Sequence, residues 1–167
     1  LLVSWLPLYS QVFFDNFGSS VNLYFRRFEF NGSIYYFIRW LGYQFSGFNL
    51  IRFIGPSLAA VVFLSIVSFS AFERIREDWG LLPGRWVVAI SIYLFCATTV
   101  HPWYTALPLV LCLFTDYRWP VLWSGLIVLT YINYSYAEYF ENLWIVLLEY
   151  TLVFGYLAWE YWRARAI

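Results

Sequence analysis

The sequence predicts an all-α protein, a polytopic bundle of about five to six transmembrane helices with an outer-face segment that contains an interfacial helix. Composition is the first reason. Of the 167 residues, 62% are hydrophobic and only 12% are charged, whereas an ordinary soluble domain is about 45 to 50% apolar and about a quarter charged. The mean hydropathy is +0.64. So little charge cannot keep a chain of this size in water, and we therefore expect a multi-pass integral membrane protein.

The second reason is the spacing of the apolar runs. A transmembrane helix needs about 20 mostly apolar residues. Two runs reach that length and three shorter runs lie between them, which predicts membrane helices at residues 50–72, 85–100, 102–115, 120–137 and 143–162. Residues 1–14 look like the end of one more helix.

The chain contains no Met and begins with Leu1. We therefore expect residues 1–167 to form a single membrane domain that is the C-terminal fragment of a longer chain. The net charge is zero and the Arg residues are scattered, which argues against binding of nucleic acid. Cys96, Cys112 and the single His suit neither a disulfide framework nor a zinc site. Ligands for a metal are lacking and no Gly-rich phosphate loop is present, so we expect no metal, no nucleotide and no other cofactor.

The positions of the Arg residues predict the orientation. Short cytoplasmic loops carry the excess of positive charge. We place the C-terminus, with Arg163 and Arg165, in the cytoplasm. Five spans that alternate in direction then also place Arg74, Arg76, Arg85 and Arg118 inside. The segment of about 15–49 and the turn at His101 then lie on the outer face, together with the loop that carries Glu138 and Glu141.

The outer segment is the least lipid-like part of the sequence. A helix is predicted over residues 33–45, capped by Asn31 or Ser33 and lying in the plane of the membrane interface. Arg26 and Arg27, close to Glu29, have two interpretations: an anchor to lipid headgroups, or a clamp for an anionic group, because guanidinium forks bind phosphate in a bidentate manner.

The turn Thr98 to Tyr104 contains the only His of the chain. Pro102 favours the first turn of the helix predicted at 102–115, whose N-terminus would face outward and suit a phosphate. His101 is either a hydrogen-bonded end cap or a ligand-binding residue. Glu149, about a third of the way into the last span, is either a functional carboxylate or one satisfied by Tyr hydroxyl groups.

The order of these parts resembles the C-terminal part of a multi-pass GT-C type glycosyltransferase, and bacterial mannosyltransferase-like members in particular. The resemblance covers most of the chain and rests on residues 24–36, YFRRFEFNGSIYY, and on HPWY at 101–104. It implies transfer of a mannose-like sugar from a polyprenyl-phosphate donor to a lipid or glycan acceptor, at the outer face of a bacterial cytoplasmic membrane. The catalytic acid of such enzymes lies in an outer loop expected upstream of Leu1, so no catalytic residue is assigned.

The resemblance also implies a set of substrate-binding residues on the outer face: Arg26, Arg27, Glu29, Asn31, Arg39, His101, Trp103 and Tyr104. The Arg side chains would meet the phosphate, and the rings would meet the sugar or the prenyl chain. Two alternatives stay open. A membrane-bound O-acyltransferase would use His101 as its base, and a transporter or accessory membrane subunit would have no enzymatic activity.

Overall fold

A computed structural model describes residues 10–26, 28–72, 79–135 and 140–165. This described part is all-α, as predicted, and contains seven α-helices: α1 (Gln11–Arg26), α2 (Ile34–Ser46), α3 (Ile51–Phe72), α4 (Leu82–Cys96), α5 (Ala106–Cys112), α6 (Trp119–Leu126) and α7 (Leu143–Arg165). Three 3-10 segments join them: η2 (Trp79–Leu81), η3 (Pro102–Thr105) and η4 (Ile127–Tyr134).

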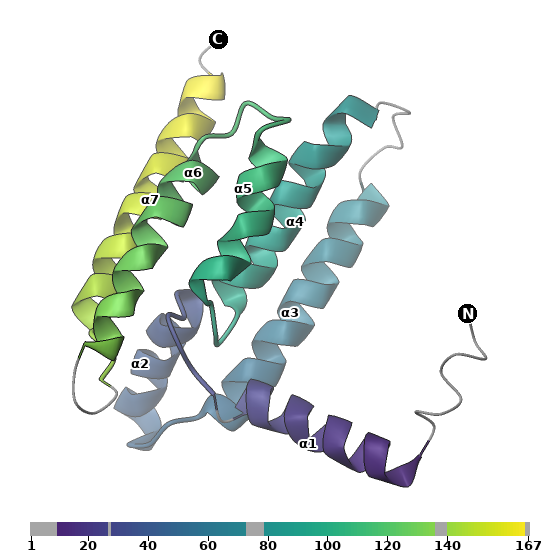
Figure 1. The fold of residues 1–167 in the computed structure, drawn as a ribbon, viewed down its shortest axis with the longest axis vertical. Helices are drawn as coiled ribbons and strands as arrows, with labels where there is room; N and C mark the ends of the chain where they lie inside the picture. Colours follow the sequence, from purple (N-terminus) through teal and green to yellow (C-terminus); the bar gives the residue numbers. More distant parts are fainter. Residues whose placement is uncertain (1–9, 27, 73–78, 136–139, 166–167) are drawn as a thin grey trace.

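The helices α3 to α7 form a bundle in which the chain reverses direction at every turn (Figure 1). Each of them packs against the next one along the chain. Their bounds follow the predicted runs to within a few residues, with α6 continued directly by η4. The main differences are at α4 and α5. Thr98 to Val100 leave the helix for an extended bridge, and the predicted helix 102–115 begins with a 3-10 turn and ends at Cys112.

The bundle has two distinct ends. One end holds α1, α2, the turn after α4 and the start of α7, and the other holds the start of α4, the connection between α5 and α6, and the C-terminus (Figure 1). The predicted grouping is confirmed, since residues 15–49 and the His101 turn share the first end and Arg85, Arg118 and Arg163 belong to the second. Arg74 and Arg76 lie outside the described residues.

Two of the described helices are long and apolar enough to cross a membrane. They cover Ile51–Ala71 in α3 and Leu143–Ala164 in α7, and only 22% of each apolar window is buried inside the structure. Large side chains such as Phe53, Phe63 and Leu147 are exposed. A soluble core helix would bury most of its apolar side chains, so the exposure of α3 and α7 favours contact with lipid.

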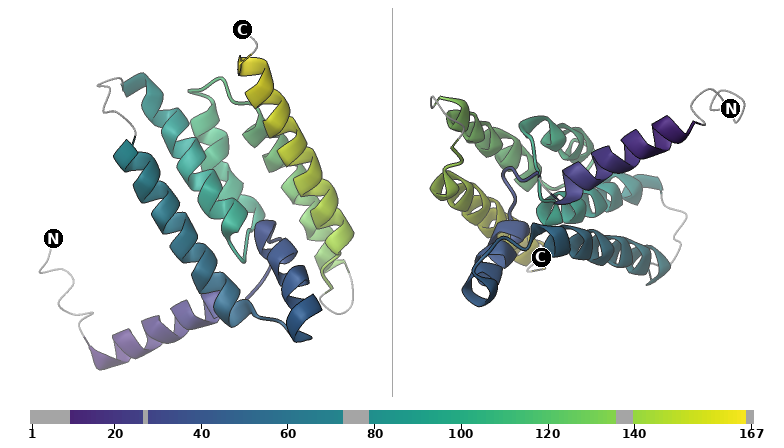
Figure 2. Two further views of the ribbon diagram at one scale, coloured as in Figure 1. Left: turned by 180° about the vertical axis from the view of Figure 1, so that it is seen from behind. Right: turned by 90° about the horizontal axis from the view of Figure 1, so that it is seen from below.

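The predicted helix at residues 33–45 exists as α2, but its orientation is different. We expected it to lie in the interface plane, and it instead runs alongside the bundle helices, while α1 extends across the end of the bundle (Figures 1 and 2). The first described helix also differs: α1 begins at Gln11 and continues to Arg26, so residues 11–14 start a helix rather than end one. Residues 1–9 lie outside the described part. Of these two helices, α1 is therefore the one oriented across the end of the bundle, as expected for an interfacial helix.

Aromatic side chains fill the centre of the bundle. Phe95 of α4 stacks on Trp123 of α6 at 4.7 Å between ring centroids and touches Phe154 of α7 at 4.7 Å. Tyr150 packs against Trp123 at 6.1 Å. Burial of such rings is the main stabilising contribution here. It fixes α4, α6 and α7 relative to one another, and α6 and α7 supply Trp123, Glu149 and Tyr150 to the site.

Candidate functional site

An extended link between α1 and α2 joins the turn after α4 through a short parallel bridge between Phe30 and Thr99. The Phe30 N–H donates to the Thr98 carbonyl at 3.0 Å, and the Val100 N–H donates to the Phe30 carbonyl at 2.8 Å. Buried backbone groups require such partners. The bridge therefore brings together the two segments that the sequence singled out, residues 24–36 and 101–104.

Asn31 is the centre of a buried polar network. It is fully buried, and its φ of 50° lies in the left-handed region, which Asn tolerates better than most residues. Its N–H donates to Glu141 Oε1 at 2.6 Å, and its Nδ2 donates to Glu149 Oε1 at 3.2 Å. The Tyr150 hydroxyl donates to its carbonyl at 2.8 Å. Asn31 thus connects the link between α1 and α2 to the loop before α7 and to α7 itself.

Two carboxylates share this network. Glu149 is fully buried, and its Oε1 also accepts a hydrogen bond from Trp123 Nε1 at 2.9 Å. Within the described part of the chain, its Oε2 has no hydrogen-bond partner. Glu141 accepts a hydrogen bond from the Tyr36 hydroxyl. Burial raises the pKa of Glu141 above its usual range, although the bonds from Tyr36 and the Asn31 N–H act in the opposite direction.

A third carboxylate, that of Glu29, lies close to this network. Glu29 forms an ion pair with Arg39 at 2.7 Å and accepts a hydrogen bond from the Tyr35 hydroxyl at 2.5 Å. Desolvation by burial, together with the neighbouring Glu29, raises the pKa of Tyr35. The Arg39 guanidinium also lies 4.3 Å from the ring centroid of Tyr36, a cation–π geometry. Arg39 and Tyr36 therefore connect Glu29 to Glu141.

The His101 turn contributes a stack of three rings. His101 lies between Trp103, at 4.4 Å with an interplanar angle of 9°, and Phe30, at 5.0 Å. Tyr104 meets His101 edge-on at 5.5 Å. Burial lowers the pKa of His101, and its Nδ1 is buried without a hydrogen-bond partner among the described residues. Trp103 is 60% exposed, so it offers a ring face to a bound molecule.

The structure brings most of the predicted residues together. Glu29, Asn31, Arg39, His101, Trp103 and Tyr104 all lie at the same end of the bundle, connected through the Phe30 bridge. Arg27 and the side chain of Arg26 lie outside the described residues. Ser33 occupies the N-cap position of α2 without capping it, because its hydroxyl donates to the Phe95 carbonyl at 2.8 Å.

Several members of the network were missed by sequence reasoning. Tyr36, Trp123, Glu141 and Tyr150 were not predicted as site residues. The available signal was the placement of Glu141 in the same outer region as the segment 15–49. Glu149, which was predicted with two open roles, is bonded to Asn31 and Trp123 instead of to a Tyr hydroxyl.

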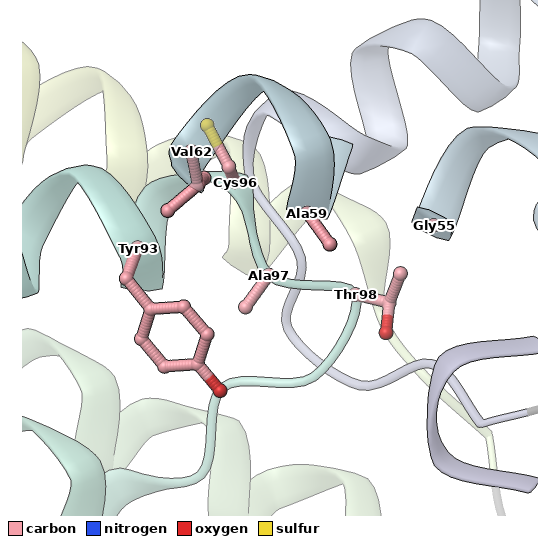
Figure 3. A pocket seen from close by; sticks show the side chains of 7 residues that line it. All are labelled: Gly55, Ala59, Val62, Tyr93, Cys96, Ala97 and Thr98. Atoms are coloured by element: carbon pink, nitrogen blue, oxygen red, sulfur yellow. The ribbon is translucent and has the colours of Figure 1, made fainter. Parts of the chain in front are cut away.

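Two cavities border this end of the bundle. The larger is a groove of about 680 Å³ between α2 and α7. The smaller is a hollow of about 20 Å³ between α3 and α4, where Gly55 and Ala59 face Ala97 and Thr98 (Figure 3). A volume of about 10 to 15 Å³ already holds one water molecule, so the small hollow has room for water and for no substrate. Cys96, beside it, is a free thiol, as is Cys112.

The fold and the network define a class: an all-α protein with two helices that could span a membrane and a polar site at one end of its bundle. Among the described residues, no group of three or more His, Cys, Asp or Glu could hold a metal ion. Comparison with family models, with curated proteins and with solved structures finds no match. The described residues of the site provide carboxylates that accept hydrogen bonds from hydroxyl groups, one paired guanidinium, and an exposed ring.

Proposed function

We propose that the chain is part of an integral membrane glycosyltransferase of the GT-C type, which transfers a mannose-like sugar from a polyprenyl-phosphate donor to a lipid or glycan acceptor at the outer face of the membrane. The observation that carries this proposal is the contact between two segments about 70 residues apart, since Phe30 bridges Thr99 and stacks on His101. These are the two segments on which the resemblance rests, and they form one site.

The chemistry of the site suits sugar transfer. Carboxylates and exposed aromatic faces are the groups that recognise sugar hydroxyls and sugar rings, and Glu29, Glu141 and Trp103 provide them. Transfer needs positive groups to stabilise the departing polyprenyl phosphate. Arg39 is held by Glu29, so we assign the phosphate to Arg26 and Arg27. His101 positions the turn through its ring contacts, and a burial-lowered pKa keeps it neutral near pH 7.

Donor turnover tests the proposal. The full-length protein, with the outer loop that the resemblance implies upstream of Leu1, is reconstituted in nanodiscs with radiolabelled polyprenyl-phosphate mannose and a lipid extract as acceptor source, and release of the label from the donor is measured. We expect His101→Ala to lower turnover about tenfold, equivalent to about 1.4 kcal/mol, and His101→Gln to retain most of it. Absence of both donor binding and turnover by the unmodified protein would refute the proposal.

Matched variants separate site residues from general aromatic effects. Trp103→Ala removes a ring at the site that is 60% exposed, and Trp162→Ala removes a ring near the C-terminal end of α7 that is 73% exposed. We expect only Trp103→Ala to raise the KM for the donor or acceptor. Equal effects of the two substitutions would show that the loss comes from membrane anchoring and would remove Trp103 from the site.

A further inference from the structure

The groove between α2 and α7 shares Tyr36 and Tyr150 with the buried network and extends beyond it along both helices. It has a volume of about 680 Å³ and is lined by two helix faces: Ile34, Tyr36, Phe37, Arg39, Trp40 and Tyr43 on α2, and Leu143, Val146, Leu147, Tyr150, Thr151 and Phe154 on α7. From Leu143 to Phe154 a helix rises roughly 16 Å. Ligand pockets typically measure about 300 to 1,000 Å³, so the groove has the size of a ligand site.

The groove walls are suited to a hydrocarbon chain. Most lining side chains are aliphatic or aromatic, and one wall is α7, which is long and apolar enough to span a membrane. Leu147 and Trp40 stay more than half exposed along the groove. A groove in the lipid-facing surface of such a helix is continuous with the acyl chains of the bilayer, which therefore supply its natural occupant.

The charges at the groove select the headgroup. Arg39 is its only charged lining residue in the described part of the chain, and Glu29 holds this guanidinium at 2.7 Å. Tyr36, also in the lining, donates its hydroxyl to Glu141. One cation and two carboxyl groups stand close together, so a phosphate meets no unpaired positive charge here. Hydroxyl groups, in contrast, meet the hydroxyls of Tyr43 and Thr151 in the lining and the exposed faces of Trp40 and Tyr43.

We propose that the α2–α7 groove binds the hydrocarbon chain of a neutral, hydroxyl-bearing lipid, whose headgroup lies against Tyr36 and Arg39. The role of this lipid as the acceptor rests on the proposed function, whereas its binding does not. The polyprenyl-phosphate donor then occupies a different site.

Photo-crosslinking tests the proposal directly. Protein in phosphatidylcholine nanodiscs is irradiated with one of two probes that carry the same diazirine-bearing dodecyl chain, attached to glucose or to phosphate, and adducts are mapped by mass spectrometry. We expect the glucoside to label residues 34–43 and 143–154 about tenfold more than the exposed face of α3, equivalent to about 1.4 kcal/mol of selectivity. The phosphate probe should label the groove several-fold less.

Two variants separate the groove from the general lipid surface. Thr151→Trp fills the groove from α7, and Val61→Trp adds the same ring to the exposed face of α3. Only Thr151→Trp should abolish the selective labelling. Leu147→Trp, at another exposed lining position, replaces Thr151→Trp if circular dichroism shows that the latter does not fold.

Each outcome decides the proposal. Uniform labelling of α3 and α7 would overturn the groove as a binding site, and equal or stronger labelling by the phosphate probe would overturn the neutral headgroup. Selective glucoside labelling in a protein that does not turn over the mannose donor would support lipid binding and refute only the glycosyltransferase.

Discussion

Replacement of Asn31 tests whether one buried residue holds the outer link against the bundle. Asn31→Ala removes one of the two donors to Glu149 Oε1, which keeps its bond from Trp123, and the loss of a hydrogen bond to a carboxyl group costs about 1 to 3 kcal/mol. Ala at a φ of 50° costs about 1 to 2 kcal/mol more, because its Cβ approaches the following carbonyl in the left-handed region. The expected loss in the free energy of unfolding is therefore about 2 to 5 kcal/mol.

Asn31→Gly separates these two contributions. Glycine adopts a positive φ without strain, so only the loss of the hydrogen bond remains. Glycine also gives the unfolded chain more conformational freedom, which lowers the stability of the Asn31→Gly protein by about 0.4 to 1 kcal/mol. Asn31→Gly should therefore be more stable than Asn31→Ala by roughly 1 kcal/mol or less, and both should be clearly less stable than the unmodified protein.

The assay is equilibrium unfolding in mixed detergent micelles, followed by far-ultraviolet circular dichroism. Asn16→Ala is the control, because Asn16 lies exposed on α1 and a surface substitution usually changes stability by less than about 0.5 kcal/mol. If both Asn31 variants matched this control, the Asn31 network would not hold the link, and the account of the site given above would be wrong.

Three further predictions concern single side chains. Burial raises the pKa of Glu141, so the stability that this group contributes is present below about pH 4.5 and declines as the pH rises through the pKa of the folded state. Glu141→Gln should remove that decline when the free energy of unfolding is measured against pH. Burial lowers the pKa of His101, so stability falls as the pH drops below about 6.5; His101→Phe, which keeps a ring in the stack, should abolish this fall, and an unchanged profile would contradict it. Arg39→Ala should cost about 1 to 3 kcal/mol, because Glu29 loses a charge-assisted bond; Arg39→Lys should cost less than Arg39→Ala, and the order is read from the same unfolding assay.

The membrane-like helices could be predicted because their signal is local. A helix that crosses a membrane needs a long, mainly apolar run, and both α3 and α7 show one in the sequence. The grouping of the loops also followed from local charge, since Arg85, Arg118 and Arg163 fall at one end of the bundle. In both cases a rule that applies residue by residue was sufficient.

The polar network could not be predicted in the same way. Asn31 and Glu141 are 110 positions apart in the sequence, and Asn31 and Glu149 are 118 apart. No periodicity links them, because their contact depends on how the link after α1 folds back onto α7. The sequence did single out Asn31 and Glu149 separately, each as a polar residue in an unusual setting. It contained no sign that they bind one another.

The orientation of α2 shows how this network decides the arrangement of the outer segment. Both α1 and α2 expose large apolar side chains such as Phe17 and Phe37, and by pattern alone either helix suits the membrane interface. The difference is that α2 follows directly after Asn31. The Asn31 bonds to Glu141 and Glu149 hold the start of α2 against α7, and the ion pair of Arg39 with Glu29 ties its middle to the link. Because α1 has no such bonds to α7 among the described residues, it is α1 that extends across the end of the bundle. The hydrogen bonds of Asn31 to Glu141 and Glu149 thus also place α2 beside α7, where α2 forms the second wall of the groove.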